Sequence, residues 1–173
     1  MAAADSPDEQ PTAPGPIIDR IEAKDPADVP GGLQGPFFQE IGKRKLEGRD
    51  AKTLVTAKDG QTGVGKSNCC DFLGYACDTS TDGFQPYKTT IDPYEFINMY
   101  GRLPLGSSSI MEEGEQFDSR RGMTNENVDA AEKWQMARVR EICAFVNLPS
   151  PSTIDTRFER LADYWINVER RGR

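Results

Sequence analysis

Residues 60–67 read Gly60-Gln61-Thr62-Gly63-Val64-Gly65-Lys66-Ser67, which matches the phosphate-binding pattern G-x-x-x-x-G-K-[ST]. Glycines at these positions let backbone N–H groups turn inward around phosphate oxygens, where a Cβ would obstruct them. Lys66 places a compact positive charge on the β- and γ-phosphates, and the Ser67 hydroxyl is a ligand for Mg²⁺. Residues 60–68, which include Asn68, are therefore predicted to bind ATP with Mg²⁺.

The segments on either side of this loop have the structure that the motif requires. The apolar run 53–57 predicts a buried strand before the loop. Residues 66–77 predict a helix after it, with Cys69 and Cys70, Leu73 and Cys77 on one face. A helix that begins here points the positive end of its dipole at bound phosphate.

Strands and helices are predicted to alternate along the rest of the chain. Predicted strands lie at 87–91, 107–111, 142–146 and 164–168, and predicted helices at 92–100 and 124–140, with a further helix start at Ser152. This alternation favours an α/β fold with three layers, αβα, around a mainly parallel sheet. Residues 37–173 are predicted to form this domain, and residues 1–36, rich in Pro, Ala, Gly and Asp, a flexible tail.

Two acidic residues, Glu112 and Glu113, follow the predicted strand 107–111. A phosphate-binding-loop enzyme needs a second acidic group beside Mg²⁺. Glu112 is therefore predicted to share the metal with Ser67, and Glu113 to orient and activate the attacking water. The alternative is a solvated acidic turn, because Glu115 and Asp118 follow closely.

Asn147 ends the predicted strand 142–146. The carboxyl ends of parallel strands face the ligand crevice, so Asn147 is predicted to sense the γ-phosphate. The predicted catalytic set is Lys66, Glu113 and Asn147. The alternative for Asn147 is a turn residue before Pro149, and the sequence does not decide between the two.

Two groups of basic residues have open roles. Candidates for an arginine finger, which would complete the site of a neighbouring subunit, are Arg120, Arg121, Arg157 and Arg160. Surface ion pairs are the alternative for each of them. The cluster Lys43-Arg44-Lys45 is predicted to be a solvated face rather than a DNA site.

The composition limits the classes of partner and compartment. A net charge of −7 argues against a broad basic surface for nucleic acid, although it leaves room for DNA held by a few loops inside a ring. An acidic surface adapted to high salt is a second interpretation. The chain has no run of about 18 apolar residues and no secretory signal, so no membrane span is predicted. Four cysteines without any histidine predict reduced core residues in a cytoplasmic protein.

The glycine loop, the Glu112-Glu113 pair and the strand that ends at Asn147 occur in the order of RecA-like, additional-strand P-loop ATPases. Over residues 50–171 the chain resembles the FtsK–HerA-type ATPases of archaeal plasmids and viruses, notably at 112–117, 148–151 and 161–163. The resemblance implies a P-loop NTPase core, ATP hydrolysis, a homo-oligomeric ring and movement or remodelling of DNA. Glu112, where an Asp is usual, and the serine-rich strand 107–111 depart from that pattern.

Other nucleotide-binding proteins are alternatives. A small metabolite kinase fits the chain length, but it does not need a water-activating Glu113. A non-catalytic, nucleotide-gated interaction module fits the serine-rich acidic strand. A GTPase is disfavoured because no [NT]KxD motif is present, and a ParA-type switch because Gln61 stands where its signature lysine would fall.

Overall fold

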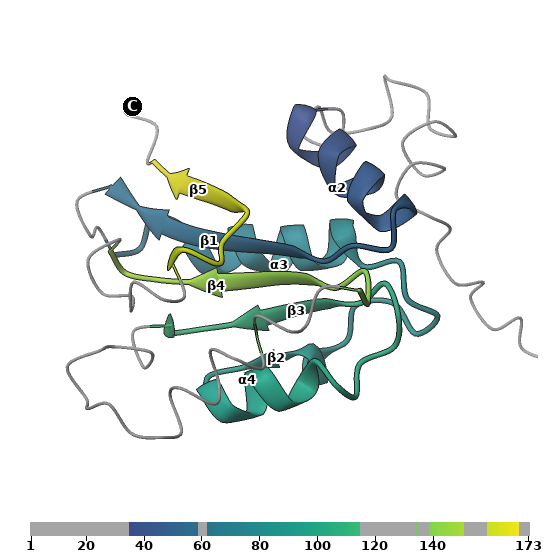
Figure 1. Ribbon diagram of the computed structural model, residues 1–173. Helices are drawn as coiled ribbons and strands as arrows, with labels where there is room; N and C mark the ends of the chain where they lie inside the picture. The colour runs from purple at the N-terminus through teal and green to yellow at the C-terminus, as the bar shows by residue number, and fades with distance from the viewer. Residues whose placement is uncertain (1–34, 59–61, 115–133, 135–138, 151–158, 170–173) are drawn as a thin grey trace, which may run out of the picture.

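The computed structural model describes residues 35–58, 62–114, 134, 139–150 and 159–169 (Figure 1). In chain order its elements are α2 (Pro36–Leu46), β1 (Ala51–Ala57), α3 (Lys66–Cys77), the 3₁₀ turn η2 (Pro86–Lys88), β2 (Thr89–Thr90), α4 (Pro93–Met99), β3 (Ser108–Met111), β4 (Cys143–Asn147) and β5 (Tyr164–Val168). The predicted alternation of strands and helices is therefore confirmed over these ranges.

The five strands form one parallel sheet in the order β2-β3-β4-β1-β5. Every residue of β1, β3 and β4 is buried, because these strands lie inside the sheet and both of their faces are covered. Exposed and half-buried residues alternate along β5, which lies at the edge of the sheet. The continuous apolar run at 142–146 correctly predicts the central strand β4.

Alternate residues of the strands contribute to two separate hydrophobic clusters. In β4, Ala144 and Val146 pack with Phe96 of α4, whereas Cys143 and Phe145 pack with residues of α2 and α3. Since successive side chains of a strand point to opposite faces, the two clusters occupy the two faces of the sheet. The fold is thus α/β, with helices on both sides of a parallel sheet.

Helix α4 illustrates how local sequence sets an element. The Asp92 side chain accepts hydrogen bonds from the backbone N–H groups of Tyr94 and Glu95, at 2.7 and 3.0 Å. Pro93 occupies the first turn, where a missing N–H costs little. The predicted start of this helix is therefore confirmed.

The basic cluster Lys43-Arg44-Lys45 lies in α2, and its prediction as a solvated face is wrong for Lys45. Lys45 is buried, and its Nζ donates to the carbonyl oxygen of Gly106 at 2.6 Å and to the hydroxyl of Thr79 at 3.1 Å. The side chain of Lys45 is thus buried, and its ammonium group supplies hydrogen bonds to the turn that contains Gly106.

Three boundaries also differ from the predictions. Helix α2 begins at Pro36, the last residue assigned to the tail, and β2 spans only Thr89–Thr90. The predicted helices at 124–140 and after Ser152 lie mostly outside the described residues. Among the described residues of these segments, Trp134 is helical and packs its ring against Phe96. Residues 139–140 form a bend, so the predicted helix does not extend to Arg140.

The described residues contain four free cysteines, of which Cys70, Cys77 and Cys143 are buried, as predicted for core residues. Within the described ranges, no helix combines the length and the apolar character that crossing a membrane requires.

Candidate functional site

The glycine loop joins the end of β1 to the start of α3, as the motif requires. Gly63 and Gly65 have φ angles of 70° and 96°, which residues with a Cβ rarely adopt. Gly65 is also the N-cap of α3, and its carbonyl oxygen accepts the first helical hydrogen bond, from the N–H of Cys69 at 2.9 Å. The two glycines therefore allow the sharp turn that brings Lys66 and Ser67 into the first helical turn.

Three polar side chains from separate segments meet beside this turn. The Ser67 hydroxyl donates to Oε2 of Glu112 at 3.1 Å. The side-chain amide of Asn147 donates to the same oxygen at 2.5 Å and to the Ser67 hydroxyl at 3.2 Å. These contacts arise because β4 lies between β1 and β3, so that the carboxyl ends of the three strands are adjacent.

The turn after β3 is unusual at Glu113 and Gly114. Glu113 is exposed and has a φ of 54°, in the left-handed region that favours glycine. A Cβ added to Gly114 would stand 2.6 Å from Cγ1 of Val146 and 2.9 Å from Cδ2 of Leu148. Gly114 therefore lets the turn press directly against β4, which fixes the position of the Glu112-Glu113 backbone.

These elements enclose an open cavity of about 500 Å³ at the carboxyl edge of the sheet. It is lined by Thr62, Gly63, Gly65, Lys66, Ser67, Asn68, Glu112, Glu113, Asn147 and Pro149. Nine of these ten residues belong to the predicted site, and only Pro149 was not predicted as part of it. Val64 is described but does not line the cavity, and Gly60 and Gln61 lie outside the described residues.

The charges in the cavity are unbalanced toward the acidic side. The described residues of its lining include one cationic side chain, Lys66, and two carboxylates, Glu112 and Glu113. A polyphosphate would be repelled by the two carboxylates unless a divalent cation came with it. The lining therefore suits an anion that arrives as a metal complex rather than a bare anion.

The oxygen donors of the cavity fit a hard divalent cation such as Mg²⁺. Ser67 and Glu112 offer adjacent oxygens, which are the ligands that Mg²⁺ prefers. No group of three or more His, Cys, Asp or Glu side chains gathers for a metal in the described part of the chain. Mg²⁺ usually binds through one or two protein ligands, with phosphate oxygens and water completing its shell. Ser67 and Glu112 are sufficient for such a site.

Cys70 lies one turn of α3 beyond Lys66, and its thiol is not suited to act as a nucleophile. Burial raises the pKa of Cys70 well above its ordinary value, and the negative charge of Glu112 raises it further. A neutral buried thiol packs as a small apolar group. The chemistry of the cavity therefore rests on its oxygen and nitrogen groups.

The candidate arginine fingers do not line this cavity in the described part of the chain. Arg160 lines a different cleft, together with Arg44 and Arg49. Arg120, Arg121 and Arg157 lie outside the described residues. Among the described residues, no arginine lines the glycine-loop cavity.

Sequence reasoning did not identify Gly114 or Pro149 as parts of the site. The signal for Pro149 is its place two residues after Asn147, at the same strand end. The signal for Gly114 is a glycine directly after the acidic pair, but the contact with Val146 that demands it becomes visible only in the fold.

Comparisons with known proteins add little to this geometry. No family model and no curated protein sequence match the chain. Among solved structures, the chain is similar to one in the E. coli MS115-1 HORMA:CdnC:Trip13 complex, with 12% sequence identity and a TM-score of 0.46. The match covers 90% of this chain but only 57% of that one. So distant a likeness carries no argument about fold or function.

Proposed function

We propose that this protein binds ATP together with Mg²⁺ at the carboxyl edge of its sheet and hydrolyses it. The observation that carries the proposal is the contact among Ser67, Glu112 and Asn147. A hydroxyl from the glycine loop and a carboxylate from a neighbouring strand end are the pair that a phosphate-binding loop uses to hold Mg²⁺. Here the two groups lie 3.1 Å apart although they are 45 residues apart in sequence.

The strand order supports a RecA-like P-loop core. Strand β4 lies between β1, which precedes the glycine loop, and β3, which precedes Glu112. An additional strand at this place is the feature that the sequence resemblance to FtsK–HerA-type ATPases implies. It also puts the Asn147 amide between the loop and the acidic pair.

Five side chains of the cavity and the backbone of the glycine loop have distinct parts in the proposed reaction. Lys66 and the backbone of residues 62–66 bind the phosphates, and Ser67 and Glu112 hold the metal. Mg²⁺, when bound, supplies positive charge that stabilises the transferring phosphoryl group. Glu113 orients a water molecule and accepts its proton. Asn147 positions the Glu112 carboxylate and senses the γ-phosphate.

We further propose that ATP hydrolysis is coupled to the movement or remodelling of DNA. It rests on the resemblance to ring-forming ATPases that move DNA. In such a ring an arginine of one subunit, from Arg120, Arg121, Arg157 or Arg160, would stabilise the transition state in its neighbour. The net charge of −7 restricts the DNA contact to a few loops.

The test combines ATP binding, turnover and subunit mass. Lys66→Ala is expected to weaken ATP binding by at least about tenfold, or about 1.4 kcal/mol, in isothermal titration with Mg²⁺. Lys58→Ala is the matched control, because Lys58 is exposed near the same loop but does not line the cavity. Equal ATP affinity of the folded Lys66→Ala variant would remove the assignment.

Turnover then separates the three classes of function. An ATPase motor releases phosphate without an added acceptor, is stimulated by DNA and has the mass of an oligomer in ATP. A kinase requires a small-molecule acceptor and works as a monomer. An interaction module binds ATP without turnover.

A further inference from the structure

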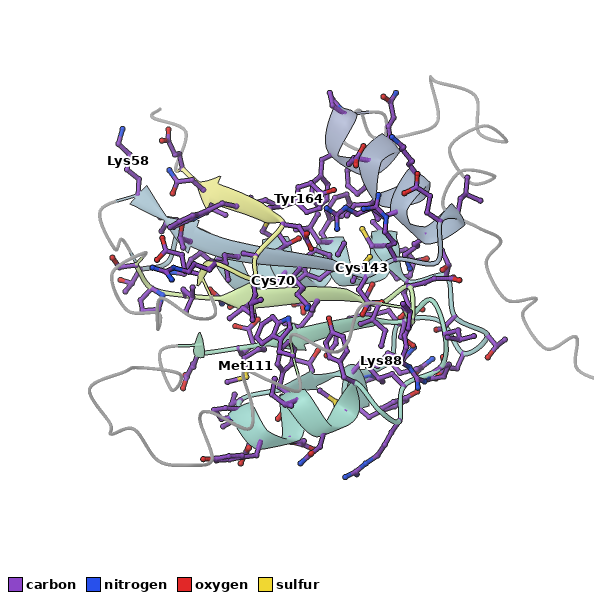
Figure 2. The ribbon with its side chains drawn as sticks, viewed as in Figure 1. Lys58, Cys70, Lys88, Met111, Cys143 and Tyr164 are labelled. Carbon is purple, nitrogen blue, oxygen red and sulfur yellow. The ribbon has the colours of Figure 1, made fainter. Side chains whose placement is uncertain are left out.

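A second cleft lies at the amino ends of the strands, whereas the glycine loop lies at their carboxyl ends. It has a volume of about 260 Å³ and is lined by Arg44, Arg49, Asp50, Lys52, Arg160, Leu161, Ala162 and Asp163. Asp50 immediately precedes β1 and Asp163 immediately precedes β5, so the cleft is at the amino ends of these strands. Figure 2 labels a residue near each end of β1: Lys58 lies beyond its carboxyl end, away from the cleft, and Tyr164 lies toward α2, near the cleft.

The cleft is positive in an acidic protein. Four of its lining side chains are cationic and two are carboxylates, so the lining has a net charge of +2, whereas the whole chain has −7. Arg49 and Arg160 are exposed at this cleft. The ion pair of Arg49 with Glu47 joins two exposed side chains, and such pairs contribute little to stability. Arg49 can therefore exchange this partner for a ligand.

The two carboxylates of the cleft are engaged by the chain itself. Asp163 accepts hydrogen bonds from Nη1 of Arg44 at 2.9 Å and from the backbone N–H of Lys52 at 3.0 Å. Oδ1 of Asp50 accepts from the N–H groups of Arg140 and Ile142, at 2.8 and 3.0 Å. Both carboxylates are thus engaged within the chain, Asp163 partly by the Arg44 guanidinium. The exposed Arg49 and Arg160 carry the cationic charge that a ligand can reach.

Arg44 is held rigidly in the wall of the cleft. Its Nη1 also donates to the carbonyl oxygen of Asp50 at 3.0 Å, and its guanidinium carbon lies 5.2 Å from the centre of the Tyr164 ring. Two buried polar atoms of the wall, Nε of Arg44 and Oδ2 of Asp50, have no hydrogen-bond partner among the described residues. Buried polar atoms are nearly always bonded, so water or a ligand is expected to complete this wall. The Nε–H of Arg44 can donate to a phosphate oxygen, whereas Oδ2 of Asp50 accepts and needs a donor such as water.

We propose that this cleft is a second ligand site, which binds the phosphate group of a small phosphate ester. A planar guanidinium matches phosphate oxygens, and a lining of +2 matches the double negative charge of a phosphomonoester. The volume is below the range of about 300 Å³ or more that holds larger ligands. The acidic remainder of the protein repels a long polyanion, which favours a small ester over a nucleic-acid strand.

The cleft is too far from the ATP cavity to hold a molecule that accepts the phosphoryl group of ATP. The seven residues of β1 separate the two sites, which amounts to about 20 Å at about 3.3 Å per residue. Direct phosphoryl transfer requires contact between reacting atoms, at about 3–3.5 Å. A ligand of this cleft is therefore an effector or structural ligand, and its binding does not depend on the proposed ATPase activity.

The experiment titrates inorganic phosphate and β-glycerophosphate into the full chain by isothermal calorimetry. The Lys66→Ala variant is the background, because it removes phosphate binding at the glycine loop. Saturable single-site binding is expected in this background, with at least about tenfold loss of affinity in Arg49→Gln/Arg160→Gln. Arg102→Gln, an exposed arginine that lines neither cleft, is expected to bind as the background does.

Three outcomes would overturn the proposal. These are no saturable binding, equal binding by the double variant, and equal loss in Arg102→Gln, which would indicate only a diffuse charge effect. A short single-stranded oligonucleotide that binds more tightly and displaces phosphate would replace the small ester by nucleic acid. Failure of ATP binding by the wild-type chain, with the phosphate titration intact, would affect only the proposed function.

Discussion

The side-chain amide of Asn147 donates a 2.5 Å hydrogen bond to the Glu112 carboxylate, which ties the end of β4 to the turn after β3. The same amide reaches the Ser67 hydroxyl at 3.2 Å. A single side chain thus positions both of the proposed metal ligands. Asn147 is buried, so this arrangement is held by the sheet rather than by solvent-exposed contacts.

Replacement of Asn147 by Ala is expected to leave ATP binding within a few-fold of wild type and to lower turnover by about tenfold or more. The reason is that Glu112 loses the donor that orients it. ATP titration and steady-state hydrolysis measure the two effects. Asn167→Ala is the control, because Asn167 is an exposed asparagine on β5. Unchanged turnover in the folded Asn147→Ala variant would contradict the positioning role.

Replacement of Glu113 by Gln is expected to retain ATP binding and to reduce hydrolysis by about 10²-fold or more, the usual contribution of a general base. The amide keeps the size and hydrogen-bonding capacity of the side chain but does not accept the proton. Single-turnover hydrolysis measures the loss. Glu159→Gln, at an exposed glutamate outside both clefts, should match wild type. Full activity of Glu113→Gln would assign the base elsewhere.

Replacement of Gly114 by Ala is expected to destabilise the fold by about 1–3 kcal/mol, because the new Cβ would overlap Val146 and Leu148. Urea unfolding measures this cost. Gly101→Ala is the matched control, since the nearest atom to its Cβ is a backbone oxygen at 3.7 Å. If Gly114→Ala and Gly101→Ala unfold at the same urea concentration, the tight contact of Gly114 with β4 is refuted.

The stability of the fold is expected to depend on pH through Asp82, whose carboxylate accepts a hydrogen bond from the buried Lys88. Burial alone would raise the pKa of Asp82, but hydrogen bonds from Lys88, Tyr87 and Ser80 outweigh it and lower the pKa to about 2. The unfolded value is about 3.9, so the stability that this carboxylate contributes is present above about pH 4. It is lost as the pH falls toward about 2.

Asp82→Asn is therefore expected to lower the melting temperature above about pH 4 and to have a smaller effect near pH 2. Thermal unfolding of wild type and variant across this pH range measures the difference. Asp92→Asn is a useful comparison, because Asn also caps helices well and Asp92 lies outside the Lys88 network. A constant difference between wild type and Asp82→Asn at all pH values would disprove the linkage.

The sequence predicts the parallel sheet because the central strands are nearly continuous apolar runs, and the glycine loop because its spacing is specific. It does not predict the burial of Lys45 or Lys88, since charged residues usually lie at the surface and only tertiary contacts show their partners. The meeting of Ser67 with Glu112 follows from the strand order. The second cleft is not predicted, because α2, β1 and the segment before β5 form it only after folding.

Two glutamates of the described chain have left-handed backbones, Glu113 with φ 54° and Glu141 with φ 58°. Residues with a Cβ held in this region store about 1–3 kcal/mol of strain, which glycine would relieve. Glu141 precedes β4 at the amino edge of the sheet, whereas Glu113 lines the cavity at the carboxyl edge. The same substitution, Glu to Gly, should therefore distinguish an effect on stability from an effect on turnover. At position 141 it is expected to change stability alone, because the relief of strain outweighs the backbone entropy that glycine loses on folding. At position 113 it is expected to stabilise the fold in the same way, but it also removes the carboxylate on which the proposed reaction depends. Thermostability and turnover are thus opposed at one residue and independent at the other.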